Sequence, residues 1–293
     1  MTQNSLPALT VGETALSRVE ELRIANRIEY FTQDQALVEA NRHWLAPHFL
    51  DSDGCFDLVF QSWIFEIQGR VVLVDPCTGN GKPHPVPFFD QLEVPFLERL
   101  EATGYRREDV DFVVCTHLHH DHCGWNTMLR DGKWVPTFPK AAYVMQQSEY
   151  DRWGKDRHLH PVFDYNEGVF ERSVQPIVDA GLAKLVAGDH ELAPGLAVTG
   201  APGHTIGHQM LHLVSAGQHA LFTGDCFHHP IQLVEPSLPF GDAEFPEQVM
   251  AIRRYLGELS ADLGALLIPA HLQAPYAVQA VRTGGIITFR AAG

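Results

Sequence analysis

The chain has 293 residues, 45% of them hydrophobic, and a formal net charge of −15, so it can bury a full core but repels nucleic acid and anionic membrane surfaces. Its start, MTQNSLPALTVGETALS, has neither the basic nor the apolar region of a secretory signal, and no stretch reaches the ~18 apolar residues that span a bilayer. Because its five cysteines are scattered, we expect a cytoplasmic protein with reduced thiols. The negative net charge favours a neutral or modest-sized small molecule as the partner.

The first half of the chain alternates helical and strand patterns. Residues 13–26, ETALSRVEELRIAN, predict a helix. A hairpin follows, in which FDLVFQSWIFEI and RVVLVDP flank a turn at Gln68–Gly69. Residues 88–103 predict a second helix that stops at Gly104. The run DFVVC at 111–115 predicts a buried strand, because it is short, apolar and rich in β-branched residues.

The second half repeats this alternation. LAVTGAPGH and HQMLHLV predict strands around a turn, HALFTGD predicts a strand that ends at Asp225, and GALLIPAH predicts one that ends at His271. Between the last two, PEQVMAIRRYLGELSAD has the clearest amphipathic helical spacing. Alternating strands and helices in both halves indicate an α/β sandwich.

The same pattern predicts the domain organisation. We expect one domain over residues 1–293, with an N-terminal extension over about residues 1–45. Residues 147–176 mix many aromatic side chains with charges and show no strand pattern. Two interpretations stay open for this segment: a surface insertion, or a lid that forms a wall of the substrate pocket.

Four histidines and an aspartate crowd the nine residues THLHHDHCG, directly after a predicted strand. Residues i and i+2 of an extended turn point to the same side, so His117 and His119 can bind one metal ion together. Asp121 and His122 follow where a helix can begin, and they can face a second ion beside the first. Imidazole and carboxylate groups suit Zn²⁺. A chance surface cluster of histidines is the alternative.

Two ions need more ligands than this motif holds, and three further candidates stand at predicted strand ends. They are His204 in PGHTIGH, Asp225 in FTGDC and His271 in IPAH. Each follows a short apolar run, so each is expected at the same kind of sheet edge.

The motifs THLHHDH, GHTIGH, TGD and PAH, in this order, resemble those of the metallo-β-lactamase superfamily over about residues 50–275. The resemblance implies a four-layer αββα sandwich with the metal site at the sheet edge. By this resemblance, the ligands of the first ion are His117, His119 and His204. Those of the second ion are Asp121, His122 and His271, and Asp225 bridges both ions.

Several other polar residues near these motifs are assigned smaller roles. Asp75, at the end of VVLVD, matches the family's first motif, and it either braces the ligand loop by hydrogen bonds or is a simple turn carboxylate. Cys123 is interpreted as a small packing residue beside a complete ligand set. Six other histidines are interpreted as surface or packing residues: His158, His160, His190, His208, His212 and His219.

Two metal ions with this ligand set predict a hydrolase. Two Zn²⁺ ions, with Mn²⁺ or Fe²⁺ as options, can hold a bridging hydroxide that attacks a carbonyl group while one ion polarises the substrate oxygen. The predicted catalytic residues are Asp121, Asp225 and His228. A non-catalytic protein stabilised by zinc is the alternative from another class, but structural zinc sites are closed and usually rich in cysteine.

The strings THLHHDHCGWNT and GDCFHHPIQ resemble most closely the branch of quorum-quenching lactonases and methyl-parathion hydrolases. This resemblance implies hydrolysis of a lactone or ester, with aryl esters and organophosphate triesters as the alternative and a β-lactam as a more remote one. Lactonases carry a tyrosine three residues after the bridging aspartate, whereas this chain has His228 and there looks similar to the organophosphate hydrolases.

An imidazole at position 228 can donate a hydrogen bond to an oxyanion or protonate the leaving alkoxide. A packing role for His228 in its turn is the alternative. The oligomeric state stays open, with a homodimer as one option.

Overall fold

The computed structural model describes residues 8–154, 164–239 and 243–292 of the chain. In these residues the strands form two seven-stranded sheets and a separate hairpin of β6 (Thr127–Arg130) and β7 (Lys133–Pro136). The first sheet contains, in spatial order, β1 (Leu9–Val11), β2 (Thr14–Arg27), β3 (Cys55–Ile67), β4 (Arg70–Val74), β5 (Val110–Val114), β8 (Ala142–Gln146) and β9 (Ala183–Val186). The second contains β10 (His190–Ala193), β11 (Leu196–Gly200), β12 (Gln209–Ser215), β13 (Gln218–Gly224), β14 (Leu266–Pro269), β15 (Ala277–Thr283) and β16 (Ile286–Ala292).

The helices lie mainly between strands that run parallel. The parallel pairs are β4 with β5, β5 with β8, β8 with β9, and β13 with β14. The chain must cross over between the two strands of each pair. The α-helices are α1 (Gln35–Leu45), α2 (Phe96–Ala102), α3 (His120–Cys123), α4 (Gln147–Trp153), α5 (Gln175–Asp179), α6 (Ile231–Val234) and α7 (Pro246–Leu263). Single turns of other helix types are η1 (Ile28–Tyr30), η2 (Gly124–Asn126), η4 (Asp164–Asn166) and η5 (Phe170–Val174).

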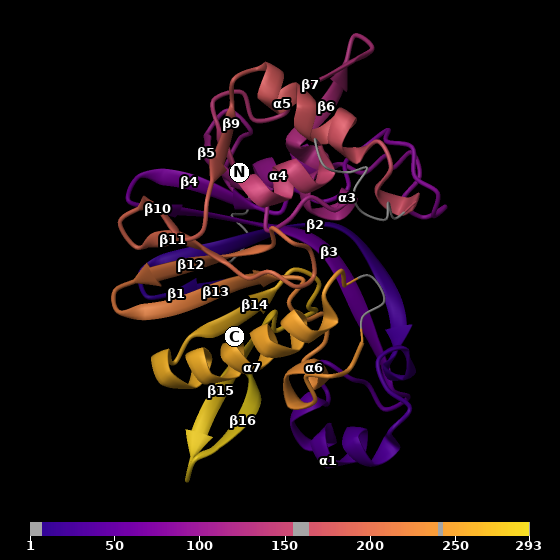
Figure 1. Ribbon diagram of the computed structural model, residues 1–293, viewed down its shortest axis with the longest axis vertical. Coiled ribbons are helices and arrows are strands. Elements are labelled where there is room, and N and C mark those ends of the chain that lie inside the picture. Colours follow the sequence, from indigo (N-terminus) through magenta and orange to yellow (C-terminus); the bar gives the residue numbers. More distant parts are fainter. Residues whose placement is uncertain (1–7, 155–163, 240–242, 293) are drawn as a thin grey trace.

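The two sheets pack face to face in the middle of the molecule (Figure 1). α4 and α5 lie on the outer side of the first sheet, and α7 covers the outer face of the second, where it contacts β14, β15 and β16. This arrangement is the predicted four-layer αββα sandwich, so the predicted fold class is confirmed.

Alternating side chains of the central strands supply the separate layers of the core. In β4, Leu73 belongs to the apolar cluster under the helices of the first sheet, whereas Val72 belongs to the cluster between the sheets. Successive side chains of a strand point to opposite faces, so a strand that is apolar at every position is buried on both sides. Between the sheets, the rings of Phe65 and Phe222 stack with centroids 5.4 Å apart.

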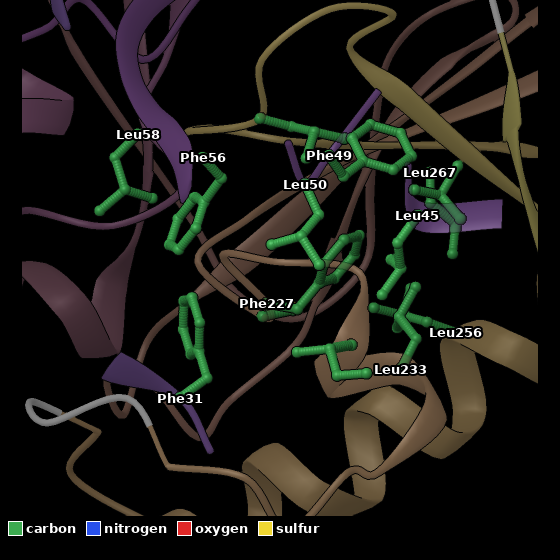
Figure 2. Close-up of a cluster of buried hydrophobic side chains, with 14 of the residues drawn as sticks. Phe31, Leu45, Phe49, Leu50, Phe56, Leu58, Phe227, Leu233, Leu256 and Leu267 are labelled. Atoms are coloured by element: carbon green, nitrogen blue, oxygen red, sulfur yellow. The ribbon is translucent and has the colours of Figure 1, made fainter. Parts of the chain in front are cut away.

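A third apolar cluster joins the N-terminal part of the chain to the second sheet and α7. Figure 2 shows Phe31, Leu45 and Phe56 from the first 60 residues facing Phe227 and Leu256. This cluster lies next to the loop that follows β13, so its packing supports the segment after Asp225.

The helix predicted over residues 13–26 is wrong, because these residues form β2. Strong helix formers dominate the segment, but its backbone pairs with β3 from Ser17 opposite Ile64 to Arg27 opposite Cys55. The register shifts between Glu20 and Leu22, so the strand holds an extra residue there. That extra residue gives the apolar positions a spacing that resembles a helix.

The helix predicted over residues 88–103 is shorter in the structure. α2 begins only at Phe96, after Pro95, and ends at Ala102 before the left-handed Gly104. The predicted hairpin turn at Gln68–Gly69 is confirmed, with positive φ at both residues. No helix in the described part of the chain combines the length and the apolar character that crossing a bilayer requires.

Candidate metal centre

Loops at one edge of the two sheets carry the predicted metal-binding side chains. They are His117 and His119 after β5, Asp121 and His122 in α3, His204 after β11, Asp225 after β13 and His271 after β14. Because β13 and β14 are parallel, their C-terminal ends place Asp225 and His271 side by side. The backbone N–H of Val59 in β3 donates to the carbonyl of His271 at 3.0 Å and links the two sheets at this edge.

Three imidazoles form one half of the cluster. His119 Nδ1 lies 2.9 Å from His117 Nε2 and 3.0 Å from His204 Nε2. All three side chains are buried, and their facing nitrogens lie within 4.8 Å of one another. Three nitrogens converging on one point suit a zinc-like ion that keeps a fourth position open.

One carboxylate and two imidazoles form the other half. His271 Nε2 lies 3.3 Å from His122 Nε2 and 3.5 Å from Asp121 Oδ2. His122 Nε2 lies 3.7 Å from the same Asp121 oxygen. These three atoms also lie within 4.8 Å of one another.

The carboxylate of Asp225 lies between the two halves. Its Oδ2 is 3.4 Å from His204 Nε2 on one side and 3.3 Å from His122 Nε2 on the other. Its Oδ1 is 3.2 Å from His271 Nε2. The structure therefore brings all seven predicted side chains together, with Asp225 in the position that a bridging ligand needs.

The charge state of these groups suits a cation. Burial lowers the pKa of His117 and His119 well below the usual value, and neighbouring histidines add to this effect, so both imidazoles are neutral. Burial raises the pKa of Asp225, but His122, His228 and His271 outweigh it and hold that pKa well below its usual range. Burial lowers the pKa of His122 and His271 too, but Asp225 and Asp121 outweigh it and raise the pKa of both. Because neutral imidazoles and ionised carboxylates are the forms that bind metal ions, an ion at these two histidines would displace their protons.

Contacts behind the cluster orient the imidazoles. Asp75 accepts hydrogen bonds from the backbone N–H of Thr116 at 2.7 Å and from its hydroxyl at 2.9 Å. The Thr116 hydroxyl in turn faces His117 Nδ1 at 3.1 Å, and Asp75 Oδ2 lies 3.1 Å from His122 Nδ1. Tying Nδ1 in this way directs Nε2 of each ring into the cluster. Asp75 thus has the contacts of a brace for the ligand loop rather than those of a simple turn residue.

His228 lies directly beside the cluster. Its Nε2 is 3.0 Å from Asp225 Oδ2, and its ring stacks on His271 with centroids 5.4 Å apart. Burial lowers the pKa of His228, and Asp225 opposes this shift. The ligand atoms of His228, Asp225 and His271 lie within 4.8 Å of one another, so His228 also belongs to a candidate metal-binding group.

Glu149 of α4 is a site residue that the sequence pattern did not indicate. Its Oε1 accepts hydrogen bonds from the backbone N–H of Leu118 at 3.0 Å and from Trp153 Nε1 at 2.6 Å. Its Oε2 accepts from the hydroxyl of Thr205 at 2.7 Å and from the N–H of Gly207 at 2.9 Å. Leu118 separates two histidines of the first motif and Thr205 follows His204, so one buried carboxylate joins both ligand loops.

Gly207 explains how Glu149 comes so close. A Cβ at position 207 would lie 2.3 Å from the backbone nitrogen of Glu149 and 2.5 Å from its Cβ. The second glycine of GHTIGH, Gly207, is therefore required by this contact. Neither residue could be found from spacing alone, because the contact joins α4 to a loop 58 residues further on.

The other histidines behave largely as packing residues. His208 is buried, and its Nε2 accepts a hydrogen bond from the backbone N–H of Asp225 at 3.1 Å, which helps to fix that loop. His212 and His219 face each other across β12 and β13 with ring nitrogens 3.0 Å apart. His190 is partly exposed in β10. The predicted packing residues His158 and His160 lie outside the described residues.

Cys123 is buried in α3, and its thiol contacts the backbone carbonyl of His119 at 3.3 Å. It belongs to none of the metal-binding groups found in the described residues.

A cavity of about 200 Å³ opens onto the metal-binding cluster. One wall is apolar and consists of Leu58, Phe60, Val86 and Phe89. The floor contains His119, Asp121, Asp225, His228 and His271, and His84, His120 and Tyr165 complete the lining. A small molecule can therefore present a polar group to the cluster and an apolar group to the wall.

Residues 147–176 contribute to this region in two ways. α4 lies behind the ligand loops, where the ring of Trp153 contacts that of His119 at 5.3 Å, but Trp153 does not line the cavity. Tyr165 does line the cavity, and its ring lies 5.6 Å from His119. Phe163 lies outside the described residues.

A family model described as the Metallo-beta-lactamase superfamily matches residues 59–271. An N-acyl homoserine lactonase of Bacillus cereus is 29% identical over 112 residues, which cover 38% of this chain and 36% of that relative. The lactonase AttM of Agrobacterium fabrum is 34% identical over 55 residues, 19% of this chain and 18% of its own length. The match thus covers about a third of the length of the Bacillus relative and less than a fifth of that of AttM.

Solved structures resemble this chain over almost its whole length. A dizinc quorum-quenching lactonase, AidC, has a TM-score of 0.71 at 17% identity, covering 97% of this chain and 96% of its own. The hydrolase AbOPH has a TM-score of 0.75 at 21% identity, with the same coverage of 97% and 96%. At such low identity, this likeness concerns the fold alone.

Proposed function

The chain belongs to the metallo-beta-lactamase superfamily, and from that premise we propose that it is a metal-dependent hydrolase that opens a lactone ring or cleaves an ester. The observation that carries this proposal is the position of Asp225 between two groups of three potential ligands. A site that served only to stabilise a fold would be closed, whereas this cluster forms the floor of a cavity.

The proposed site holds two divalent cations, with zinc as the first choice and manganese or iron as options. His117, His119 and His204 would hold one ion, Asp121, His122 and His271 the other, and Asp225 both. When bound, such a pair supplies Lewis acidity and an activated water molecule. The donor set supports this assignment, because five buried imidazoles and two carboxylates form two groups whose ligand atoms lie within 4.8 Å of one another, with Asp225 next to both.

The residues of the chain divide the remaining tasks. Asp225 orients its neighbours on both sides and can accept a proton, and Asp121 holds negative charge at the cavity floor. His228 Nε2, bonded to Asp225 and lining the cavity, can donate a hydrogen bond to the substrate oxygen or a proton to the leaving alkoxide. Catalytic roles for these three residues agree with their position in the cavity.

The shape of the cavity supports a substrate with an apolar arm. Leu58, Phe60, Val86 and Phe89 can cover an acyl chain while the carbonyl faces the polar floor. N-acyl homoserine lactones have this character, and the chain resembles proteins named as lactonases for them. We therefore place lactones first among the substrates.

One observation favours a second substrate class. Position 228 holds a histidine rather than the tyrosine that the lactonase resemblance implies. A buried imidazole hydrogen-bonded to Asp225 can equally well donate a proton to the leaving group of an aryl ester or an organophosphate triester. Hydrolysis of these compounds is the alternative, and a β-lactam is a more remote one.

The domain assignment forms part of the proposal. A single domain over residues 1–293, with an N-terminal extension over about residues 1–45, agrees with the way β2 continues the first sheet. We assign a pocket-forming role to residues 147–176, because Tyr165 lines the cavity. The cytoplasmic location and the homodimer stay predictions from the sequence.

A hydrolysis panel tests the proposed function. The metal-loaded protein is offered an N-acyl homoserine lactone, a nitrophenyl ester, a phosphotriester and a cephalosporin. We expect the lactone to be opened fastest, Asp225→Asn to lose most activity, and the matched variant His190→Gln, outside the cluster, to keep it. Failure to hydrolyse any of the four, at full metal load, would refute the proposal.

A further inference from the structure

A second and larger cavity, of about 400 Å³, lies between α1, α6, α7 and β16. Its lining shares no residue with that of the metal-site cavity, so it is a separate feature of the described residues. Its volume falls in the range of small-molecule sites. Nothing in the proposed hydrolysis uses it.

The wall of this cavity contains a buried arginine. Arg253 of α7 is only 3% exposed, and it donates to the carbonyls of Cys226 at 2.8 Å, Pro236 at 2.9 Å and Leu238 at 2.6 Å. These bonds use Nε and Nη1, and within the described residues no carboxylate forms an ion pair with the guanidinium. Burial lowers the pKa of Arg253 to about 10, so the group stays charged at neutral pH. A charge buried without a counterion favours the approach of an anion.

Neighbouring side chains reinforce this positive charge. Arg254 is exposed and also lines the cavity, as does His43. The one carboxylate in the lining, Glu258, is engaged by Arg282 at 2.6 Å. Although Arg282 also pairs with Asp262, the lining itself has two arginines and one carboxylate, a positive balance in a chain whose net charge is −15.

The rest of the lining is aromatic and aliphatic. The rings of Trp44 and Phe289 lie 6.3 Å apart at the cavity wall, next to Leu233. Gly257 of α7 allows this packing, because a Cβ there would approach Phe289 to 3.3 Å. A flat or extended apolar group fits between such walls.

We propose that this cavity binds a small carboxylate that carries an aromatic or aliphatic body. The planar carboxylate pairs with the exposed guanidinium of Arg254, whose fork matches its geometry, and the buried charge of Arg253 adds a longer-range attraction. The apolar body covers Trp44 and Phe289. This proposal stands on the second cavity alone and does not depend on the proposed hydrolysis.

The test uses 4-phenylbutanoate as the probe and 4-phenylbutanol as its neutral match, with binding to the metal-loaded protein measured by titration calorimetry. Arg254→Gln is the test variant, because the side chain is exposed and its loss should not disturb folding. Arg253 is left intact, because it holds the backbone next to Asp225. Arg290→Gln removes one charge from exposed β16 outside the cavity lining and is the matched control.

We expect the carboxylate to bind and the alcohol not to, with affinity about tenfold weaker in Arg254→Gln, as the loss of one charge-assisted pair implies. The Arg290→Gln variant should bind like the original protein. Equal affinity in Arg254→Gln, equal binding of the alcohol, or no binding would each overturn the proposal. The proposal would also be overturned if 4-phenylbutanoate inhibited ester hydrolysis competitively and bound Arg254→Gln as tightly as the original protein, because it would then bind at the metal centre.

Discussion

At the scale of single residues, His228 is the side chain whose role can be measured most cleanly. It contacts Asp225 and lines the cavity, and a preorganised donor at that position contributes about 10²–10³ to the rate. We expect His228→Ala to lower kcat by that factor, and to slow alkyl lactones more than nitrophenyl esters, because poor leaving groups need the proton most. Steady-state kinetics on both substrates measures this.

Metal content is the control for His228. Elemental analysis of His228→Ala should give the same metal content as the original protein if the side chain acts on the substrate. A variant that loses an ion would show that His228 is a ligand, which its distance from Asp225 and His271 permits. Full activity on both substrates would remove it from the mechanism.

Glu149 tests whether the two ligand loops must be held together. In Glu149→Gln one carboxylate oxygen becomes an NH₂ group, which cannot accept hydrogen bonds. Two of the present hydrogen bonds would then be lost, either those from Leu118 and Trp153 or those from Thr205 and Gly207. Loss of such outer contacts typically weakens metal affinity about 10–100-fold. Competition with a zinc chelator measures the change.

The exposed Glu98 of α2 provides the control substitution, Glu98→Gln, which should leave metal affinity unaltered. If Glu149→Gln lowers the melting temperature but binds zinc as tightly as the original protein, Glu149 supports the fold and not the site.

The ligands could be predicted from the sequence, whereas Glu149 could not. Seven side chains stand in short motifs directly after strands, and strand ends meet at one sheet edge, so spacing alone brings them together. Glu149 stands in a helix among other polar residues, and nothing local distinguishes it. Only the tertiary packing of α4 against two loops gives it four donors.

At the scale of elements, the segment after α4 should control substrate choice through Tyr165. This ring lines the cavity, whereas Trp153 lies behind His119 and donates to Glu149. We expect Tyr165→Ala to change the relative rates on lactones of different acyl length. Trp153→Phe should lower all rates together, because it affects the position of the metal ligands and not the cavity wall.

Measured kcat/KM values over a series from short to long acyl chains separate the two effects. Relative rates that stay constant in Tyr165→Ala would make the segment a surface insertion, the other interpretation that the sequence left open.

Elements were predicted well where burial on both faces decides them and poorly where one residue interrupts the pattern. β4 and β5 are short apolar runs, and both were found. The sequence predicted a helix for β2 because the bulge at Glu21 interrupts the two-residue alternation typical of a strand. The Glu21 side chain is buried. There it accepts hydrogen bonds from the N–H groups of Thr78 and Gly79, a contact that a helical pattern cannot indicate.

At the scale of the whole molecule, stability should fall in mild acid because neutral histidines are buried. Burial lowers the pKa of His229 to about 4 from 6.5, although its bond to the Phe49 carbonyl opposes this. Below pH 6.5 the unfolded chain binds a proton that the folded chain does not. The stabilisation is therefore complete above pH 6.5 and is lost as the pH falls toward 4, by about 2 kcal/mol at pH 5.

Urea unfolding at pH 7.5 and pH 5 tests this linkage. His229→Asn keeps an acceptor for the Ile231 N–H, which now bonds His229 Nδ1, but cannot titrate. Its loss of stability between the two pH values should be smaller than that of the original protein by about 2 kcal/mol. Release of metal affects both proteins alike, so an equal loss in the two would contradict the assignment.

The overall architecture followed from the alternation of strands and helices together with the motif resemblance. What the sequence did not indicate is how the outer strands close the molecule. The edge strands β1, β9, β10 and β16 were not predicted, because exposed and apolar residues mix in them or they are short. The second cavity depends on β16 and α1, so it too was beyond a prediction from local pattern.

The central claim is that two ions, shared through Asp225, enable this chain to open a lactone. The most direct measurement is the initial rate of ring opening of an N-acyl homoserine lactone, followed by acid release, while metal-free protein is titrated with Zn²⁺. We expect no activity without metal and a rate that rises until two ions per chain are bound. A rate independent of metal, a plateau at one ion, or no ring opening at two would contradict it.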